Sequence, residues 1–224
     1  MKRIKIEQKH LSALNTLIAS LKNLGFLNRN DVEFAFKNFP RHEFIPTSEQ
    51  NQAYVNRPLE IMKNQTISQP GVVSRMTEWL DVKDGQCILE VGTGSGWQTA
   101  ILSLLVGTGT VYSIEIHSEL FEFAKKNLEK FKIYNVNLIL GDGGEGYLQA
   151  SPYDRIIINA ACNEVPLTLF EQLKENGFLV APMGPSSQSL VLLKKTATGI
   201  IEIKNQSNYV FVPLLGKFGK KRIS

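Results

Sequence analysis

The sequence contains only two cysteines and three histidines among its 224 residues. Cys87 and Cys162 are not spaced as metal ligands and stand where small apolar residues would serve, so we expect two core thiols and no metal site. The three histidines do not form a catalytic triad. His42, beside Arg41, could help to bind an acidic substrate, but a surface histidine is the simpler expectation.

Long apolar runs are also missing. No stretch approaches the roughly 18 apolar residues that a membrane-spanning helix needs, and the start of the chain lacks the apolar segment of an export signal. We therefore predict a cytoplasmic protein that has no membrane partner.

The excess of positive charge is small, with a net charge of +4. The ends of the chain hold more basic residues than this surplus, namely Lys2, Arg3, Lys5, Lys217, Lys220, Lys221 and Arg222. Basic ends can bind nucleic acid, but we interpret these as solubilising termini. We expect no nucleic-acid partner, and a monomer.

The most informative segment is 87–96, which reads Cys-Ile-Leu-Glu-Val-Gly-Thr-Gly-Ser-Gly. Its apolar start predicts a buried strand, and glycine at every second position predicts a turn that lets a ligand lie against bare backbone. A helix over 97–105 would present its N-terminus to that ligand. A dinucleotide site needs glycine where Trp97 stands, so the spacing disfavours a nicotinamide cofactor.

This glycine spacing resembles the cofactor loop of class I S-adenosyl-L-methionine (SAM) methyltransferases. The resemblance implies that SAM is the cofactor and that the loop contacts it through Glu90, Gly92, Thr93, Gly94, Ser95 and Gly96. For the loop alone, an ordinary glycine-rich turn between a strand and a helix is the alternative.

Two further acidic residues follow predicted strands. Glu115 ends the run 110–115, and Asp142 follows the run 136–140. In a doubly wound sheet these strand ends lie beside the loop, where Glu115 could accept the ribose hydroxyls and Asp142 the adenine amino group. Singly, a solvated strand end and a turn residue are the simpler interpretation. Together, with their neighbours Ile116 and Gly143, they predict an adenosine site.

Strands and helices alternate from Asp81 onward. The pattern predicts an α/β fold, a Rossmann-like and mostly parallel doubly wound sheet covered on both faces. The expected strands are 87–91, 110–115, 136–140, 155–159 and 178–182, and the expected helices are 97–105, 118–130 and 166–174. Ser118 should cap the second helix, and Asn176-Gly177 should end the third. Later runs at 189–195, 200–204 and 208–214 lack helical crossovers, so we expect antiparallel strands there.

The first 80 residues do not follow this alternation. Amphipathic helices over about 8–24 and 31–38 precede an irregular stretch that runs to Gln65. We expect one methyltransferase domain over 1–224. Residues 1–80 would form an N-terminal helical cap over the cofactor and acceptor sites, and residues 81–224 the SAM-binding core.

A second resemblance is carried by Gln65-Thr66-Ile67-Ser68-Gln69-Pro70, which is similar to the hallmark hexapeptide of the protein-L-isoaspartate O-methyltransferases. Similar blocks, such as 41–46, 89–100 and 211–214, extend the resemblance over about residues 11 to 216. It implies methyl transfer to the free carboxylate of L-isoaspartyl residues in damaged proteins or peptides, as a step of protein repair. Ser68 falls on the family's active-site serine, and Gln65, Thr66 and Ile67 fall at the junction of cofactor and acceptor.

The reaction needs little catalytic equipment. A carboxylate with a pKa of about 4 is already ionised at neutral pH, so no general base is required. Ser68 fits the role of a single hydroxyl donor that orients the acceptor. The alternative for Ser68 is a structural cap of a helix over 69–80.

Four residues on the acceptor side depart from the family pattern: Asn56, Met62, Asn64 and Val210. They leave two alternatives open. One is a related carboxyl O-methyltransferase that acts on a normal aspartate or another carboxylate. The other is a SAM-binding module without turnover.

Overall fold

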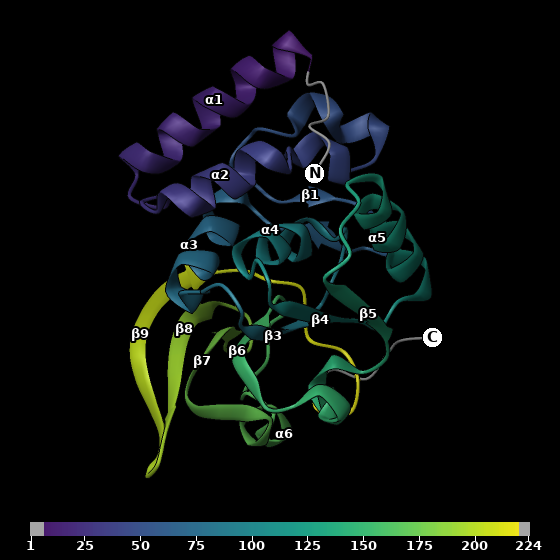
Figure 1. Cartoon of the computed structure of the whole chain (residues 1–224). Helices are drawn as coiled ribbons and strands as arrows, with labels where there is room; N and C mark the ends of the chain where they lie inside the picture. Colours follow the sequence, from purple (N-terminus) through teal and green to yellow (C-terminus); the bar gives the residue numbers. More distant parts are fainter. Residues whose placement is uncertain (1–6, 220–224) are drawn as a thin grey trace.

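The computed structural model describes residues 7–219, and its centre is a seven-stranded sheet with the order β5-β4-β3-β6-β7-β8-β9 (Figure 1). The strands are β3 (Cys87–Val91), β4 (Thr110–Glu115), β5 (Val136–Leu140), β6 (Tyr153–Ile158), β7 (Leu173–Met183), β8 (Gln188–Thr196) and β9 (Gly199–Tyr209). β3 to β7 are parallel, whereas β8 and β9 pair antiparallel. The predicted α/β sheet with an antiparallel C-terminal region is confirmed.

The chain reverses its direction of travel across the sheet at the central strand. From β3 it passes outward through β4 to β5, and then returns to β6 on the other side of β3. At such a switch point the loops that follow neighbouring strands diverge and open a crevice. The fold therefore places the loop after β3 where a ligand can reach it.

Helices cover the two faces of the sheet unequally (Figure 1). One face carries α3 (Pro70–Leu80), α4 (Trp97–Leu105) and α5 (Ser118–Lys130), and the other carries α6 (Leu167–Glu171) with the 3-10 helices η3 (Gly143–Glu145) and η4 (Leu148–Ala150). Successive strand residues alternate between two apolar clusters. Ile88 belongs to the core under α3 to α5, and Leu89 to the core on the α6 side.

The N-terminal part packs over the first of these faces. It comprises α1 (Gln8–Asn23), α2 (Asn30–Asn38), the 3-10 helices η1 (Arg41–Phe44) and η2 (Thr47–Gln52), and a hairpin of β1 (Leu59–Glu60) and β2 (Thr66–Ile67). Leu14 and Leu21 of α1 and Phe36 of α2 belong to the same apolar cluster as Ile88 of the central strand. The two predicted N-terminal helices are confirmed, and burial of their apolar faces ties them to the core.

The segment after β6 differs from the prediction. α6 ends at Glu171, and Gln172 already pairs with β6 by accepting from the backbone N–H of Tyr153 at 2.8 Å. Asn176 and Gly177 therefore do not end a helix. They lie within β7, where Asn176 has a φ of 63° and the register with β6 shifts. Asparagine tolerates this left-handed conformation, so the pair marks an irregularity inside a strand.

Two further predicted details were wrong. The runs 200–204 and 208–214 are not separate strands, because β9 continues unbroken to Tyr209 and the chain then leaves the sheet. Since β9 is an exposed edge strand, the polar residues between the two runs need no burial. Ser118 does not cap its helix: the N-cap residue is His117, and the Ser118 hydroxyl donates to Glu119.

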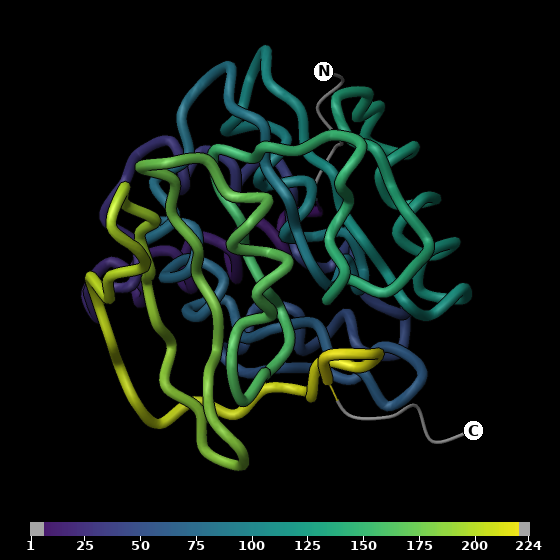
Figure 2. Tube along the Cα trace, turned by 90° about the horizontal axis from the view of Figure 1, so that it is seen from below, coloured from purple at the N-terminus to yellow at the C-terminus, as the bar shows by residue number. Residues whose placement is uncertain are grey.

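After β9 the chain returns along the carboxyl ends of the central strands (yellow in Figure 2). Val212 accepts from the N–H of Ala161, and Leu214 donates to the Ala161 oxygen, both at 2.7 Å. Of the basic residues at the two ends, only Lys217 lies within the described residues. No helix within 7–219 is long and apolar enough to cross a membrane.

Candidate active site

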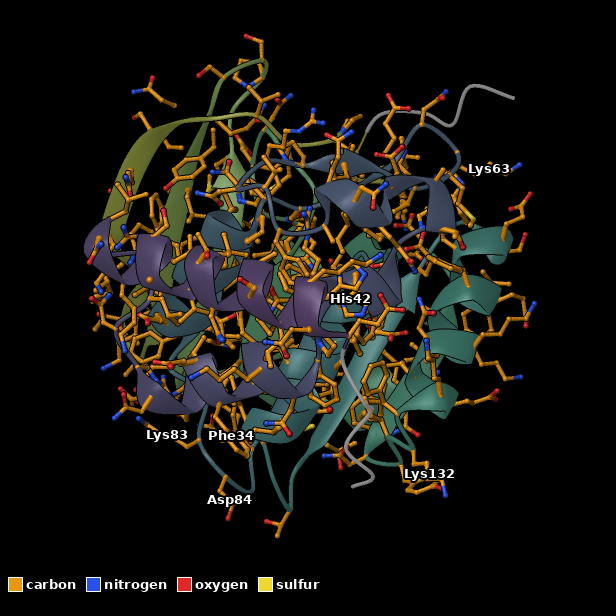
Figure 3. All side chains as sticks on the ribbon, turned by 90° about the horizontal axis from the view of Figure 1, so that it is seen from above. Phe34, His42, Lys63, Lys83, Asp84 and Lys132 are labelled. Carbon is orange, nitrogen blue, oxygen red and sulfur yellow. The ribbon has the colours of Figure 1, made fainter. Side chains whose placement is uncertain are left out.

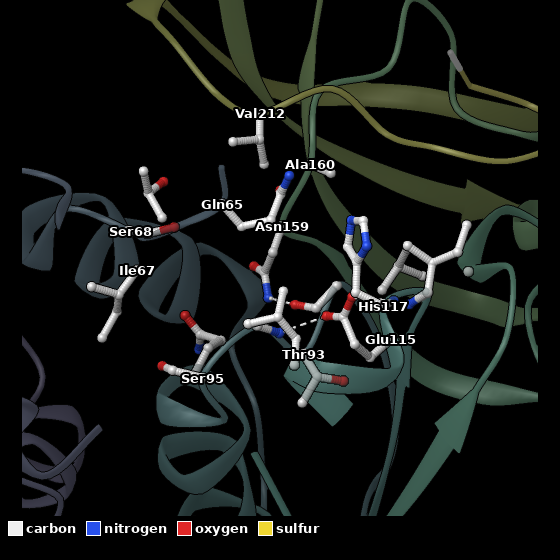
Figure 4. A pocket seen from close by; sticks show the side chains of 18 of the residues that line it. Gln65, Ile67, Ser68, Thr93, Ser95, Glu115, His117, Asn159, Ala160 and Val212 are labelled. Carbon is white, nitrogen blue, oxygen red and sulfur yellow. Dashed lines mark hydrogen bonds between the residues drawn. The ribbon is translucent and has the colours of Figure 1, made fainter. Parts of the chain in front are cut away.

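A cavity at the carboxyl ends of β3, β4 and β6 lies between the glycine loop and the hexapeptide, and we refer to it as the main cavity of the site (Figure 4). Most of the predicted site residues line it, namely Gln65, Thr66, Ile67, Ser68, Gly92, Thr93, Gly94, Ser95, Glu115, Ile116 and Gly143. The chain thus brings together four segments that are far apart in the sequence. Glu90, Gly96 and Asp142, which were also predicted, do not line it.

The glycine loop has the backbone that its composition predicts. Gly92, Gly94 and Gly96 have φ values of 89°, 58° and 82°, which disfavour any side chain. A Cβ atom on Gly94 would have no protein atom within 4 Å, and Gly94 lines the main cavity. A Cβ atom on Gly96 would lie 3.3 Å from Ala124 of α5. Gly94 therefore keeps space for a ligand, whereas Gly96 allows two helices to approach.

Glu115 joins the ends of two neighbouring strands. Its carboxylate accepts from the backbone N–H of Gly94 at 2.8 Å, and from those of Ile116 and His117 at 3.0 Å each. A carboxylate has about four acceptor positions, so this one can still accept from a ligand hydroxyl. Figure 4 shows Glu115 at the side of the main cavity opposite Ser68, held against the glycine loop.

Glu90 lies beneath the loop instead of in the cavity. It is fully buried and accepts from the hydroxyls of Thr99 and Ser113 and from the amide of Asn159. Burial raises the pKa of Glu90 to about 7, although these hydrogen bonds favour the ionised form. Glu90 therefore supports the loop from below and does not line the cavity, and its contact with the cofactor stays a prediction.

Asp142 is turned away from the main cavity. Its carboxylate accepts from the backbone N–H of Gly144 at 2.9 Å and from that of Lys217 at 2.7 Å. It thereby caps η3 and holds the C-terminal segment. Its neighbour Gly143 lines the main cavity, whereas Asp142 does not, and the adenine contact of the Asp142 side chain stays a prediction.

Ser68 stands where two cavities meet. It lines the main cavity and also a side cavity, which we define by Pro58, Thr66, Ser68, Gln69, Val72, Asn159, Asn208, Tyr209, Val210, Phe211 and Val212. The N-cap residue of α3 is Gln69, and that helix start has no side-chain capping bond. The structural alternative for Ser68, a helix cap, is therefore wrong.

The sequence matches the family model described as protein-L-isoaspartate(D-aspartate) O-methyltransferase over residues 12–219. The chain belongs to this family.

Relatives and solved structures agree with the family model. A protein-L-isoaspartate O-methyltransferase of Methanosarcina mazei is 43% identical over 99% of this chain and 91% of the relative. One of Pyrococcus horikoshii is 45% identical over 90% of this chain and 92% of the relative. A candidate enzyme of this kind from Plasmodium falciparum, solved in complex with S-adenosyl-L-homocysteine, has a TM-score of 0.79 at 25% identity, covering 89% of this chain and 96% of that one.

In this isoaspartate methyltransferase family member, a buried cation holds the segment that carries Ser68. Arg41 is 1% exposed and donates to the backbone oxygens of Ala53, Arg57, Ile67 and Ser68. Its guanidinium also lies 5.6 Å from the ring centre of Trp97. Burial lowers the pKa of Arg41 to about 9, so the group stays charged at neutral pH.

His42 is buried as well, and the predicted surface position is wrong. Its side chain stacks on the ring of His10 at a centroid distance of 4.0 Å, and its Nδ1 lies 2.5 Å from the Tyr54 hydroxyl. Figure 3 shows His42 next to α1, inside the outline of the molecule, whereas Lys63 and Lys132 reach the rim. Burial lowers the pKa of His42. The packing of α1 over η1 causes this, and no local sequence pattern marks that contact.

Several residues that line the main cavity were not predicted from the sequence. They are Val73, Met76, Val91, Trp97, Gln98, Ile114, His117, Leu120, Asn159, Ala160, Val212, Pro213, Leu214 and Leu215. Two signals were available: Asn159 ends the fourth predicted strand as Glu115 ends the second, and Val212 to Leu214 belong to a block that resembles the family.

The main cavity fits an adenosyl amino acid. Gly94 leaves open space beside the backbone, and Glu115 offers a fixed carboxylate to ribose hydroxyls. Two buried atoms of lining residues, Gln98 Oε1 and His117 Nε2, have no hydrogen-bond partner among residues 7–219. Buried polar atoms of this kind call for a polar ligand.

Proposed function

We propose that this protein transfers a methyl group from SAM to the free carboxylate of L-isoaspartyl residues in damaged proteins or peptides. The observation that carries the proposal is the position of Ser68, on the wall shared by the main cavity and the side cavity. A cofactor in the first and an acceptor in the second would meet at this hydroxyl. Family membership supports the same acceptor chemistry.

The chain's own residues account for the steps that a methyl transfer needs. When bound, SAM supplies a methyl group that is activated by a positively charged sulfur. The glycine loop and Glu115 would hold the adenosine, and the Ser68 hydroxyl would donate to the acceptor carboxylate and orient its attacking oxygen. Alignment and exclusion of water are then the main sources of rate enhancement. No side chain has to remove a proton, because the acceptor is already ionised.

The side cavity suits a negatively charged acceptor. None of the residues that define it is acidic, so a carboxylate that enters meets no repulsion from its walls. Ser68, Gln69 and Asn208 offer it neutral hydrogen-bond donors. Such partners orient a carboxylate without binding it as tightly as an arginine would.

The four residues that depart from the family pattern lie in or near the segments expected to bind the acceptor. Asn56 accepts from the backbone N–H of Gly71 at 2.9 Å, and so holds the first turn of α3. Asn64 has a φ of 55° in the turn between β1 and β2, where asparagine is tolerated. Val210 lines the side cavity and is 82% exposed. Met62 accepts from Gln65 in the same hairpin turn. Val210 is thus the departure placed to meet the acceptor directly.

One assay separates the proposal from its alternatives. Labelled SAM is incubated with the protein and with matched peptides that contain either L-isoaspartate or normal aspartate at one position, and base-labile methyl ester is counted. The proposal expects ester on the isoaspartyl peptide only. Ester on the aspartyl peptide would identify a related carboxyl methyltransferase, and calorimetric SAM binding without any ester would identify a binding module.

Three expectations from the sequence remain predictions. They are the monomeric state, the cytoplasmic location, and the union of residues 1–80 and 81–224 in one domain. The apolar cluster that α1 and α2 share with β3 supports the last of these.

A further inference from the structure

Gln98 lines the main cavity and has a buried amide oxygen. The side chain is 7% exposed, and its Nε2 donates to the hydroxyl oxygen of Thr77 at 2.9 Å. The Thr77 hydroxyl itself donates to the Val73 carbonyl at 2.7 Å, so it can only accept from Gln98. The amide orientation is therefore fixed. Its Oε1 is buried and has no partner within residues 7–219.

The orientation of the Asn159 amide follows from its hydrogen bonds in the same way. Its Nδ2 donates to the Glu90 carboxylate at 2.9 Å and to the Gly92 carbonyl at 3.0 Å. Both partners are acceptors, so only the NH2 group can face them, and the amide oxygen must face away. Asn159 lines the main cavity and the side cavity, and Figure 4 shows it between Ser68 and Glu115.

Two fixed acceptors from different elements thus belong to residues that line one cavity, and residues 7–219 supply no donor to either oxygen. Leaving the buried Gln98 oxygen unpaired is costly, so a ligand donor is expected there, and the half-buried Asn159 oxygen can accept from the same ligand. With the ribose hydroxyls assigned to Glu115, the donor left at the other end of an adenosyl amino acid is its α-ammonium group, which has three N–H bonds.

We propose that the amide oxygens of Gln98 and Asn159 form the binding site for the ammonium group of the cofactor's amino-acid end. The inference rests on the proposed function, because it takes SAM as the ligand of the main cavity. It adds two binding residues, and it assigns to Glu90 the role of a positioning residue that keeps the Asn159 amide turned toward the ligand.

The test compares two probes by isothermal titration calorimetry. One is S-adenosyl-L-homocysteine, and the other is its des-amino analogue, which lacks only the ammonium group. The wild-type protein should bind the first about tenfold or more tightly than the second, because hydrogen bonds to a charged donor are strong. Gln98→Met and Asn159→Leu should each reduce that ratio several-fold while leaving the affinity for the des-amino analogue within about twofold.

Gln86→Met is the matched control, since Gln86 lies in the turn before β3 and does not line the main cavity. Melting temperatures establish that each variant is folded. If a variant does not fold, the comparison of the two probes with the wild-type protein still tests the inference. Equal affinity of the wild type for both probes would overturn the inference. So would an unchanged ratio in both variants, or an equal loss for both probes, which would mean that the residues only shape the loop. A wild-type protein that binds neither probe would overturn the proposed function as well.

Discussion

The guanidinium of Arg41 donates to the backbone oxygen of Ser68 at 3.0 Å, from a position that is 1% exposed. The same group holds the Ala53 oxygen at 2.8 Å. A buried arginine thus fixes the backbone of the segment that carries Ser68, and Ser68 lines the main cavity and the side cavity. The guanidinium is paired with carbonyls and no carboxylate among the described residues, so its cost of burial is offset by several bonds at once.

Arg41→Met should lower both stability and turnover. Leaving several buried carbonyls without donors is expected to cost about 2–4 kcal/mol of unfolding free energy. In the folded fraction, kcat should fall at least tenfold because Ser68 is no longer held in place, while affinity for S-adenosyl-L-homocysteine changes less. Arg41→Lys should rescue little, since one ammonium cannot replace a planar fork of donors. Wild-type kcat in folded Arg41→Met would contradict a positioning role.

Ser68→Ala should lower turnover strongly with little effect on the fold. The serine makes no capping bond at α3, so its removal should leave the melting temperature within about 1 °C, and kcat should fall about tenfold or more. Steady-state kinetics with an isoaspartyl peptide measures the change. Ser12→Ala, at an exposed position on α1, is the matched control. A stable Ser68→Ala enzyme with full kcat would remove Ser68 from the reaction.

Gly94→Val should abolish cofactor binding, since a side chain there enters the ligand space. Because the φ of 58° at Gly94 also strains any side chain, a control for backbone strain is needed. Gly25→Val supplies this control. Gly25 has a φ of 68° and does not line the main cavity, and a Cβ atom on it would meet no other part of residues 7–219 within 4 Å. Both variants should lose similar stability, but only Gly94→Val should show no calorimetric binding of S-adenosyl-L-homocysteine.

Glu115→Ala should weaken cofactor binding about ten- to hundredfold, as expected for lost hydrogen bonds to a charged group. Part of the loss would come from the freed backbone N–H of Gly94. Glu115→Gln keeps one acceptor oxygen, so its affinity for the cofactor should lie between those of the wild type and Glu115→Ala. Calorimetry gives the three constants, and a change below twofold in Glu115→Ala would place the residue outside the binding site.

Glu90 should make stability depend on pH with a definite sign. Its folded pKa of about 7 lies above the ordinary value of 4.5, so between these values the folded protein keeps a proton that the unfolded chain has lost. Its contribution is most favourable below pH 4.5 and is lost as pH rises toward 7, by about 3 kcal/mol at most. Glu90→Gln should remove this trend.

Urea unfolding at several pH values measures the difference between Glu90→Gln and wild type. Other carboxylates titrate equally in both proteins, so they cancel in that difference. The variant should gain stability relative to wild type as pH rises from 5 to 8. A constant difference across this range would show that Glu90 is already ionised at pH 5.

The sheet could be predicted because its signals are local. A parallel strand buried on both faces reads as an apolar run, and Cys87–Val91 and Thr110–Glu115 match the predicted ranges. The helix end predicted at Asn176-Gly177 was wrong because an asparagine with a left-handed backbone occurs both at helix ends and at strand irregularities. The bounds predicted for edge strand β9 were wrong because an exposed strand has little apolar pattern.

The candidate site could be predicted at positions where the residue type alone determines what a ligand would meet. Bare backbone at Gly94 and an acid at a strand end, Glu115, are such cases. Asp142 has the same signal, yet its carboxylate is taken by the N–H of Lys217, 75 residues away in the chain. The roles of Arg41, Gln98 and Asn159 likewise depend on partners from other elements. Only tertiary packing decides which face of such a side chain a ligand meets.

Trp97 is an intrinsic fluorophore at the main cavity. Its indole is 2% exposed, lines the main cavity, and is fixed by a hydrogen bond from Nε1 to the Phe39 oxygen at 2.8 Å. The second tryptophan, Trp79, does not line that cavity. Indole emission responds to the polarity and charge of its surroundings, so binding of a cationic cofactor in the main cavity should change the emission of Trp97 more than that of Trp79. Occupancy of this site can therefore be followed in real time, without a label, in the unmodified chain.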